Sequence, residues 1–278
     1  MEFPIATKNS FQNFGLYHKE PYDFAVFSWQ SQRNQVSGYY CIYRFVTAAF
    51  YLSNVVFCLT TSKHLDYWFI YLSHIGLLLQ TLHLLISAAV PIQFLLISQK
   101  DSLNNSNLTF LVRFSWFLYN VTNLLSFGIS GVFWTGLSVI EREPKNTDFL
   151  IHGINSIVTL CDIFISKRPC RILHFHHSLA VFLPYVTFSI IYWAAGGRRE
   201  NGIPAIYPVL NWDNLTLTIP FVLAGLTVGV FLGHALVWAL HLLRDRVLIT
   251  CTTKDELVDK GHFQIQSNPG FVPDWILS

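Results

Sequence analysis

WFIYLSHIGLLLQTLHLLISAAVPIQFLLIS, residues 68–98, is the stretch that decides the fold of this chain. It contains no Asp, Glu, Lys or Arg. A helix that rises about 1.5 Å per residue crosses the roughly 30 Å of hydrocarbon in a bilayer within about 20 residues, so the stretch predicts a membrane-spanning helix. Because it exceeds that length, we expect it to tilt, to kink at Pro91 or to extend beyond the hydrocarbon.

The rest of the 278-residue chain has the same character. Hydrophobic residues make up 52% of it and charged residues only 12%, whereas soluble domains carry about 25% charged residues. We therefore predict an all-α fold, a polytopic transmembrane helix bundle with about six spans. The predicted spans cover residues 42–60, 68–98, 111–140, 149–165, 173–195 and 217–243.

The distribution of Lys and Arg predicts the orientation of the bundle. With about six spans, both termini share one side of the membrane with the second and fourth loops, and these four segments hold most of the basic residues. Basic residues beside short loops stay cytoplasmic, so we expect both termini to be cytosolic. The predicted organisation is a cytosolic N-terminal segment at 1–41, the transmembrane bundle at 42–243 and a cytosolic C-terminal tail at 244–278.

Three N-x-S/T sequons bear on this orientation. Asn104 and Asn107 lie in a loop that the charge distribution places in the cytosol, whereas Asn214 lies in a loop on the outer side. Which of the three carries a glycan stays open at this point.

Several classes of function are excluded by composition. The formal net charge is only +2, and no basic run resembles a nucleic-acid footprint. The five cysteines form no CxxC pair, and their odd number argues for free thiols. His174, His176 and His177 lack a fourth ligand at a suitable spacing, so we predict neither a metal nor a cofactor. Membrane lipids are the predicted partners, and no protein partner is indicated.

Polar residues inside the spans are spaced to share helix faces. Such residues are costly in hydrocarbon and therefore face the bundle interior, where they either join helices or form a site. The first span presents Arg44, Thr47, Tyr51, Asn54, Cys58 and Thr61, and the fourth presents His152, Asn155, Ser156, Thr159 and Asp162. The second adds His74, Gln80, Thr81 and His83, and the third adds Asn120, Asn123 and Ser130.

The chain resembles the rolling stone family of multi-pass membrane proteins, which is named for a role in insect myoblast fusion. The motifs that carry the resemblance are YRF at 43–45, FLIHGINSIVTL at 149–160, SKRP at 166–169, IIYWAAGG at 190–197 and IYPVLNW at 206–212. The resemblance implies a multi-pass protein acting in cell fusion, and it favours the plasma membrane over the endoplasmic reticulum.

This family is in turn similar to the androgen-induced and androgen-dependent membrane hydrolases, which cleave fatty-acid esters of hydroxy fatty acids with a Thr nucleophile and a His. FVT at 45–47 resembles the segment that holds their nucleophile, which implies Thr47. The HG pair at His152 and Gly153 resembles the segment that holds their catalytic histidine, and Tyr207 with Pro208 matches as well. The chain departs from that pattern at Asn155, where a second histidine is expected.

Two main hypotheses follow. In the first, Thr47 attacks a lipid ester while His152 takes its proton, and substrate-binding donors stabilise the oxyanion. Asn120, Asn123 and Asn155 are the candidate donors. In the second, the protein is a non-enzymatic membrane organiser or fusion scaffold, and the polar stripes are helix packing. A transporter ranks last because the sequence lacks paired inverted halves.

Overall fold

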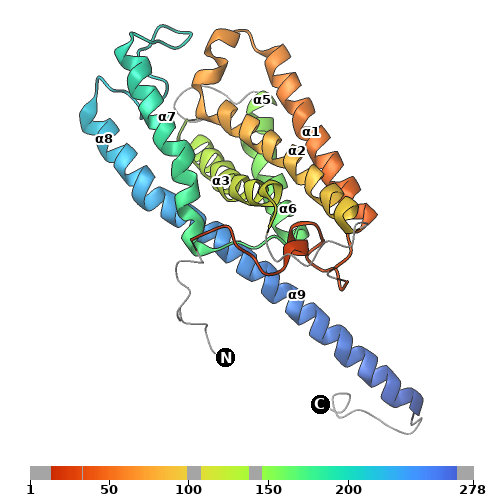
Figure 1. Cartoon of the computed structure of the whole chain (residues 1–278). Coiled ribbons are helices and arrows are strands. Elements are labelled where there is room, and N and C mark those ends of the chain that lie inside the picture. Colours follow the sequence, from red (N-terminus) through yellow and green to blue (C-terminus); the bar gives the residue numbers. More distant parts are fainter. Residues whose placement is uncertain (1–13, 33, 99–107, 138–145, 268–278) are drawn as a thin grey trace.

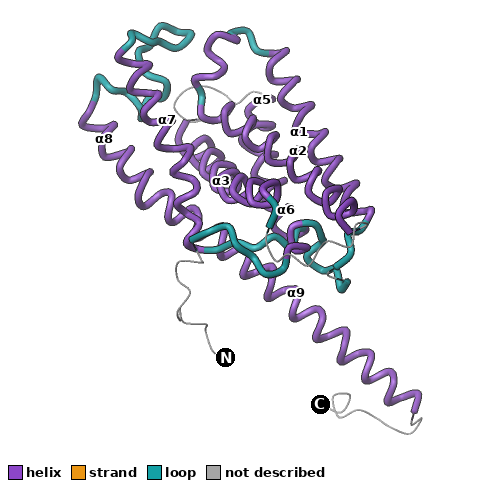
Figure 2. The backbone as a smooth tube through the Cα atoms, viewed as in Figure 1, coloured by secondary structure: helices purple, strands orange, loops and turns teal. Residues whose placement is uncertain are grey.

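The computed structural model of the chain describes residues 14–32, 34–98, 108–137 and 146–267 (Figure 1). Throughout these residues the regular structure is helical, and pairing between extended segments is limited to isolated bridges (Figure 2). The helices are α1 (Gly38–Thr61), α2 (Leu72–Ser98), α3 (Phe110–Val132), α5 (Asn146–Asp148), α6 (Asn155–Ile165), α7 (His176–Ala194), α8 (Leu215–Ala224) and α9 (Val230–Ser267). Short 3-10 helices cover Pro21–Phe24, Leu65–Ile70 and Ile172–Phe175.

Three segments of the described chain are π-helical. Phe133–Leu137 extends α3, Phe149–Ile154 precedes α6, and Gly225–Gly229 joins α8 to α9. π-helical residues make up well under 1% of residues in globular proteins, and π-bulges are frequent at functional sites. The three π-helical segments therefore point to the parts of the bundle where a functional site is expected.

The prediction of an all-α membrane helix bundle is confirmed. Within the described ranges, four helical segments are long and apolar enough to cross a membrane, and Phe149–Ile165 is a shorter apolar segment. The spanning candidates are Gly38–Thr61, Leu72–Leu96, Ile172–Ala194 and Leu215–Cys251. α3 occupies the remaining predicted position. The count of six spans and the sides of the termini stay predictions.

The helices differ in how much of their apolar surface is covered by protein. Half of the most apolar window of Leu72–Leu96 is buried, whereas only 11% of the corresponding window of Leu215–Cys251 is buried. α2 is therefore central, and α8 with the adjoining part of α9 lies at the edge of the bundle (Figure 1). Because large apolar patches are rare on soluble proteins, the uncovered side chains of this edge mark a lipid-facing surface.

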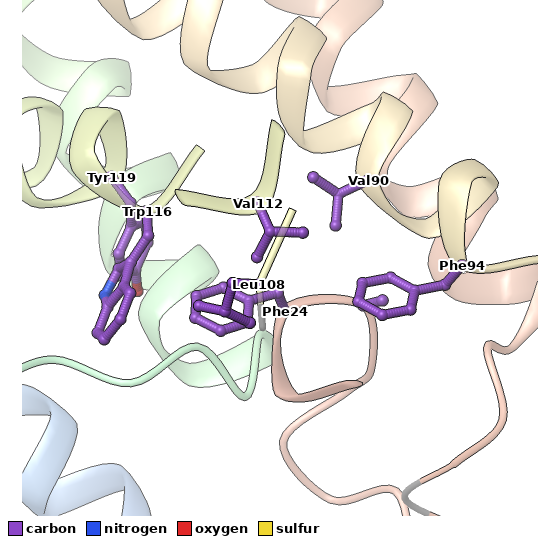
Figure 3. Packing of buried hydrophobic residues seen from close by; sticks show 8 residues of the cluster. Phe24, Val90, Phe94, Leu108, Val112, Trp116 and Tyr119 are labelled. Carbon is purple, nitrogen blue, oxygen red and sulfur yellow. The ribbon is translucent and has the colours of Figure 1, made fainter. Parts of the chain in front are cut away.

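One end of the bundle is closed by the N-terminal strap, residues 14–32. Phe24 and Ala25 are fully buried in a cluster with Val90, Trp116 and other side chains of α2 and α3 (Figure 3). Burying one such apolar side chain contributes about 1.5–3 kcal/mol. The strap is thus part of the folded bundle.

Polar contacts fasten the same strap to the turn after α6. The Ser28 backbone amide donates to the Ile165 carbonyl at 2.8 Å, and the Lys167 amide donates to the Val26 carbonyl at 3.3 Å. Lys167 also forms an ion pair with Asp23 at 3.1 Å. The strap therefore holds the start of the SKRP motif by both backbone and side-chain contacts.

At the opposite end, α7 closes with a Schellman motif supplied by the AAGG sequence. Gly196 has φ of 77°, and its amide donates to the Trp193 carbonyl at 2.9 Å. The Gly197 amide donates to the Tyr192 carbonyl at 2.8 Å. This left-handed turn is the usual helix ending that glycine permits, and it sends the chain into the loop before α8.

Candidate functional site

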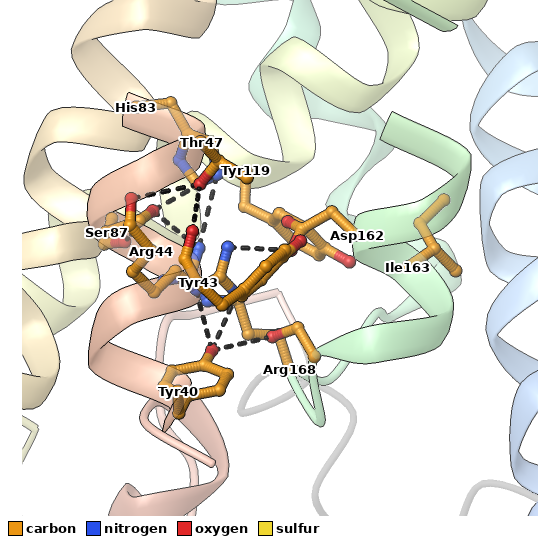
Figure 4. A network of polar contacts seen from close by, with 12 residues as sticks. Tyr40, Tyr43, Arg44, Thr47, His83, Ser87, Tyr119, Asp162, Ile163 and Arg168 are labelled. Atoms are coloured by element: carbon orange, nitrogen blue, oxygen red, sulfur yellow. Dashed lines mark hydrogen bonds and ion pairs between the residues drawn. The ribbon is translucent and has the colours of Figure 1, made fainter. Parts of the chain in front are cut away.

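The polar interior is organised around a buried ion pair between α1 and α6 (Figure 4). Arg44 Nη1 donates to Asp162 Oδ1 at 2.7 Å, and the Tyr43 hydroxyl donates to the same oxygen at 2.8 Å. Arg44 Nε and Nη2 donate to the Tyr40 hydroxyl oxygen at 2.9 and 2.6 Å. Arg44 is completely buried, so the Asp162 carboxylate and the Tyr40 hydroxyl replace the water that the guanidinium has lost.

A second fully buried guanidinium, that of Arg168, lies nearby. Its Nη1 donates to Ser87 Oγ at 2.9 Å and lies 3.3 Å from His83 Nε2, and its Cζ sits 5.5 Å from the centre of the Tyr119 ring. Burial and the neighbouring charge of Arg44 lower the pKa of Arg168. No described carboxylate forms an ion pair with Arg168, and Asp162, which pairs with Arg44, is the carboxylate whose charge favours both arginines.

The contacts between α1 and α6 set the register of the predicted dyad. Arg44 meets Asp162, and seven residues further along α1 the Tyr51 hydroxyl donates to Asn155 Oδ1 at 2.8 Å. The two helices therefore run antiparallel, and His152 lies level with Asn54. Thr47 is about seven residues away from that level, or ~10 Å along the helix axis.

Thr47 makes local contacts instead. Its hydroxyl lies 3.0 Å from the carbonyl oxygens of both Tyr43 and Arg44, which is the usual way a helical threonine satisfies its hydroxyl. The structure thus does not bring Thr47 and His152 together, and the dyad stays a prediction.

The three predicted donors occupy separate surroundings. Asn155 pairs with Tyr51 of α1, whereas Asn120 Nδ2 lies 3.1 Å from His174 Nδ1 and 3.3 Å from His177 Nδ1. Asn123 is buried, and its Nδ2 has no hydrogen-bond partner among the described residues. His174 and His177, which follow the SKRP motif, thus link α3 to the start of α7. In the described part of the chain, no three His, Cys, Asp or Glu side chains are arranged to hold a metal ion.

A large cavity lies at the other end of the bundle, and we name it the α3–α8 cavity. It has a volume of about 960 Å³ and is walled mainly by apolar and aromatic side chains from α2, α3, α7, α8 and α9. Small-molecule sites span roughly 300–1,000 Å³, so this cavity is large enough for a sizeable ligand. Its deeper walls include Leu124, Ile151, Phe182, Tyr185 and Val230.

All three described π-helical segments border this cavity. Phe133 comes from the first, His152 from the second, and Gly225 with Gly229 from the third. His152 is buried and stacks on Phe133, with ring centres 3.9 Å apart and planes 12° apart. The Ser130 hydroxyl donates to the His152 backbone carbonyl. The π-helical turn, together with the contacts that His152 makes with Ser130 and Phe133 at the end of α3, thus holds His152 in the cavity wall.

The rim of the cavity carries both signs of charge. Lys63, Arg199 and Glu200 border it, and the Tyr71 hydroxyl donates to Glu200 Oε2 at 2.7 Å. Burial raises the pKa of Glu200, but the hydrogen bond from Tyr71, a backbone hydrogen bond and the charges of Arg199 and His64 together outweigh burial, so that the pKa lies below its usual value. This bond fastens the loop after α7 to the start of α2.

The chain is similar to known proteins over most of its length. The family model described as protein rolling stone matches residues 5–255. The chain belongs to the rolling stone family. It is 28% identical over 237 residues to Protein rolling stone of Drosophila melanogaster, covering 82% of this chain and 84% of that relative. No solved structure matches the chain.

Two of the rolling stone motifs contribute residues to the wall of the α3–α8 cavity. Tyr207, Val209 and Leu210 of the IYPVLNW motif line the cavity, as does His152 of the FLIHGINSIVTL motif. Thr47 and the three predicted asparagines do not line it. Sequence reasoning missed the cavity because apolar residues from separate helices form it. The available signals were the IYPVLNW motif and the glycines of GLTVG at 225–229.

Proposed function

We propose that this rolling stone family protein binds a single-chain lipid amphiphile in the α3–α8 cavity. The observation that carries the proposal is the cavity itself, about 960 Å³ of mainly apolar space inside a membrane bundle. Ligand sites are typically concave and apolar, with a few placed polar groups that fix orientation. The apolar walls suit an acyl chain.

The rim suggests the nature of the head group. Lys63 and Arg199 offer positive charge beside the negative Glu200, and complementary charge favours a matching ligand. A head group that carries both signs, such as phosphocholine, fits this rim better than a singly charged one. Lysophosphatidylcholine is therefore the probe of choice.

The family resemblance supports the setting in which this binding operates. Rolling stone proteins are named for a role in myoblast fusion, and we place this chain at the plasma membrane in cell fusion. A protein that holds one bilayer amphiphile acts on the lipids that two fusing membranes must rearrange. No catalytic step is needed for this role.

Lipid-ester hydrolysis is the second candidate, and one observation favours it. His152 lies in the wall of the cavity, which is where a base for a bound ester would have to lie. The nucleophile is the weaker half, because Thr47 lies ~10 Å away along the axis and bonds to its own helix. Moving it to His152 requires a shift between α1 and α6 that breaks the Arg44–Asp162 pair.

Binding can be tested with purified protein in nanodiscs and a fluorescent lysophosphatidylcholine. Val222 of α8 lines the cavity, whereas the adjacent Leu223 is exposed and does not. We expect Val222→Trp to weaken binding at least about tenfold, or ~1.4 kcal/mol, while Leu223→Trp binds as the wild type does. Equal binding by both variants, or no binding by the wild type, would refute the proposal.

Hydrolysis is tested on the same preparation with a fluorophosphonate probe and a fatty-acid ester of a hydroxy fatty acid. The hydrolase hypothesis expects labelling and cleavage that Thr47→Ala and His152→Ala both abolish. The binding proposal expects Thr47→Ala to bind the probe lipid normally. Cleavage that depends on both residues would establish the enzyme instead.

A further inference from the structure

The cavity has an unpacked side that faces the lipid. Gly128 of α3 and Gly225 and Gly229 of the π-helical segment all line the cavity and are all exposed. Three residues after Gly128 and Gly225, respectively, Gly131 and Val228 are exposed but do not line the cavity. The cavity wall and the outer surface of the bundle therefore meet along this edge.

The space beside these glycines is open. A Cβ atom added at Gly128 or at Gly225 would meet nothing within 4 Å, and one at Gly229 would meet only the Ala224 carbonyl oxygen at 3.6 Å. Other helical glycines of the bundle allow close packing. A Cβ atom at Gly233 would lie 2.3 Å from Leu124 Cδ1. The edge glycines thus do not bring helices together, and their lack of side chains leaves the edge of the cavity unfilled.

The helix on one side of this edge is weakly held. Within α8 only Thr218 is buried, and the helix lies at the margin of the bundle (Figure 1). Its apolar side chains, including Leu217 and Leu223, are exposed as lipid-facing residues are. The surface beside the opening is therefore apolar, as contact with acyl chains requires.

We propose that the amphiphile enters the α3–α8 cavity sideways from the bilayer, through a portal bordered by Gly128, Gly225 and Gly229. This inference rests on the proposed binding function and adds the source of the ligand. A lipid that follows this route keeps its tail in apolar surroundings throughout. Entry through the charged rim would instead expose the apolar tail to water, which is unfavourable.

The chain offers a matched control for this portal. Gly131 also lies on α3, is exposed and has no atom within 4 Å of an added Cβ, but it does not line the cavity. Gly128→Phe and Gly225→Phe should narrow the portal, and Gly131→Phe should only add a side chain to the lipid-facing surface. None of the three replaces a glycine with positive φ, so each variant is expected to fold, which its thermal transition verifies.

The experiment measures the rate at which fluorescent lysophosphatidylcholine, supplied in the nanodisc bilayer, reaches the protein. We expect Gly128→Phe and Gly225→Phe to slow loading at least about tenfold, while Gly131→Phe loads at the wild-type rate. Wild-type loading rates in both portal variants, with equilibrium binding intact, would overturn the portal and leave the binding function standing. Absence of binding in the wild type would overturn both.

Discussion

Neutralising Asp162 is the perturbation that should damage the bundle most. The Arg44–Asp162 contact is 2.7 Å long, with side-chain exposures of 0% and 5%. Removing one partner of a buried ion pair costs about 3–5 kcal/mol, because the other charge stays buried without compensation. Asp162→Asn also replaces the acceptor of the Tyr43 hydroxyl, and it leaves the guanidiniums of both Arg44 and Arg168 inside the bundle. We therefore expect a loss near the upper end, ~5 kcal/mol.

The assay is unfolding of the micelle-bound protein by a denaturing detergent, followed by tryptophan fluorescence, for a double-mutant cycle. Asp162→Asn and Arg44→Met should each be strongly destabilising. The double variant should lose less than their sum by ~2 kcal/mol or more, because contacting residues couple. Additive losses, or an Asp162→Asn loss below ~1 kcal/mol, would refute the reasoning that this pair anchors α1 to α6.

Three further predictions concern other parts of the chain. Burial raises the pKa of Asp23, but the contacts with His18 and Lys167 outweigh burial and hold this pKa below its ordinary 3.8. The stability that these contacts add to the strap is therefore fully present above pH 3.8 and is lost as the pH falls through the lowered pKa. Limited proteolysis of the strap should rise over that acid range in the wild type but not in Asp23→Asn, whose strap should already be less stable at neutral pH. Gly233→Val should cost about 1–3 kcal/mol by overpacking Leu124, and adding Leu124→Ala should recover part of the thermal stability. Glycosidase treatment should shift the protein expressed in animal cells unless Asn214→Gln is present; an unshifted wild type would contradict the outer placement of this exposed sequon.

The helices were predictable because each span carries its own signal. Residues 68–98 predict a span by composition alone, and α2 occupies Leu72–Ser98. The spacing of polar residues in the first span also predicted an interior face, and Arg44, Tyr51 and Asn54 are indeed buried. The same stripe includes Thr61, which is exposed. Helical periodicity shows which face of a helix points into the bundle. It does not show at which residue along that face the neighbouring helix ends.

The cavity and the strap escaped prediction for a different reason. The cavity forms where neighbouring helices do not pack against one another, and the sequence of one segment alone does not show where that happens. Its clearest sequence signal was Tyr207 in a family motif, whose loop is held beside the cavity by long-range contacts such as the Tyr71–Glu200 hydrogen bond. The strap shows no helical periodicity, yet Phe24 is fully buried, because aromatic side chains on an irregular segment can fill the end of a bundle.

The Arg44–Asp162 pair cannot form until long after Arg44 has been synthesised. Its partners are separated by 118 positions, and ribosomes add roughly 5–20 residues per second, so Arg44 waits about 6–24 seconds for its carboxylate. An arginine in the middle of an isolated spanning helix costs about 2.5–3.5 kcal/mol at the translocon, and Arg44 reduces that cost because it lies near the N-terminal end of α1 (Gly38–Thr61), within reach of the headgroups. Until α6 emerges, α1 must therefore snorkel its guanidinium to the headgroups or remain beside the insertion machinery.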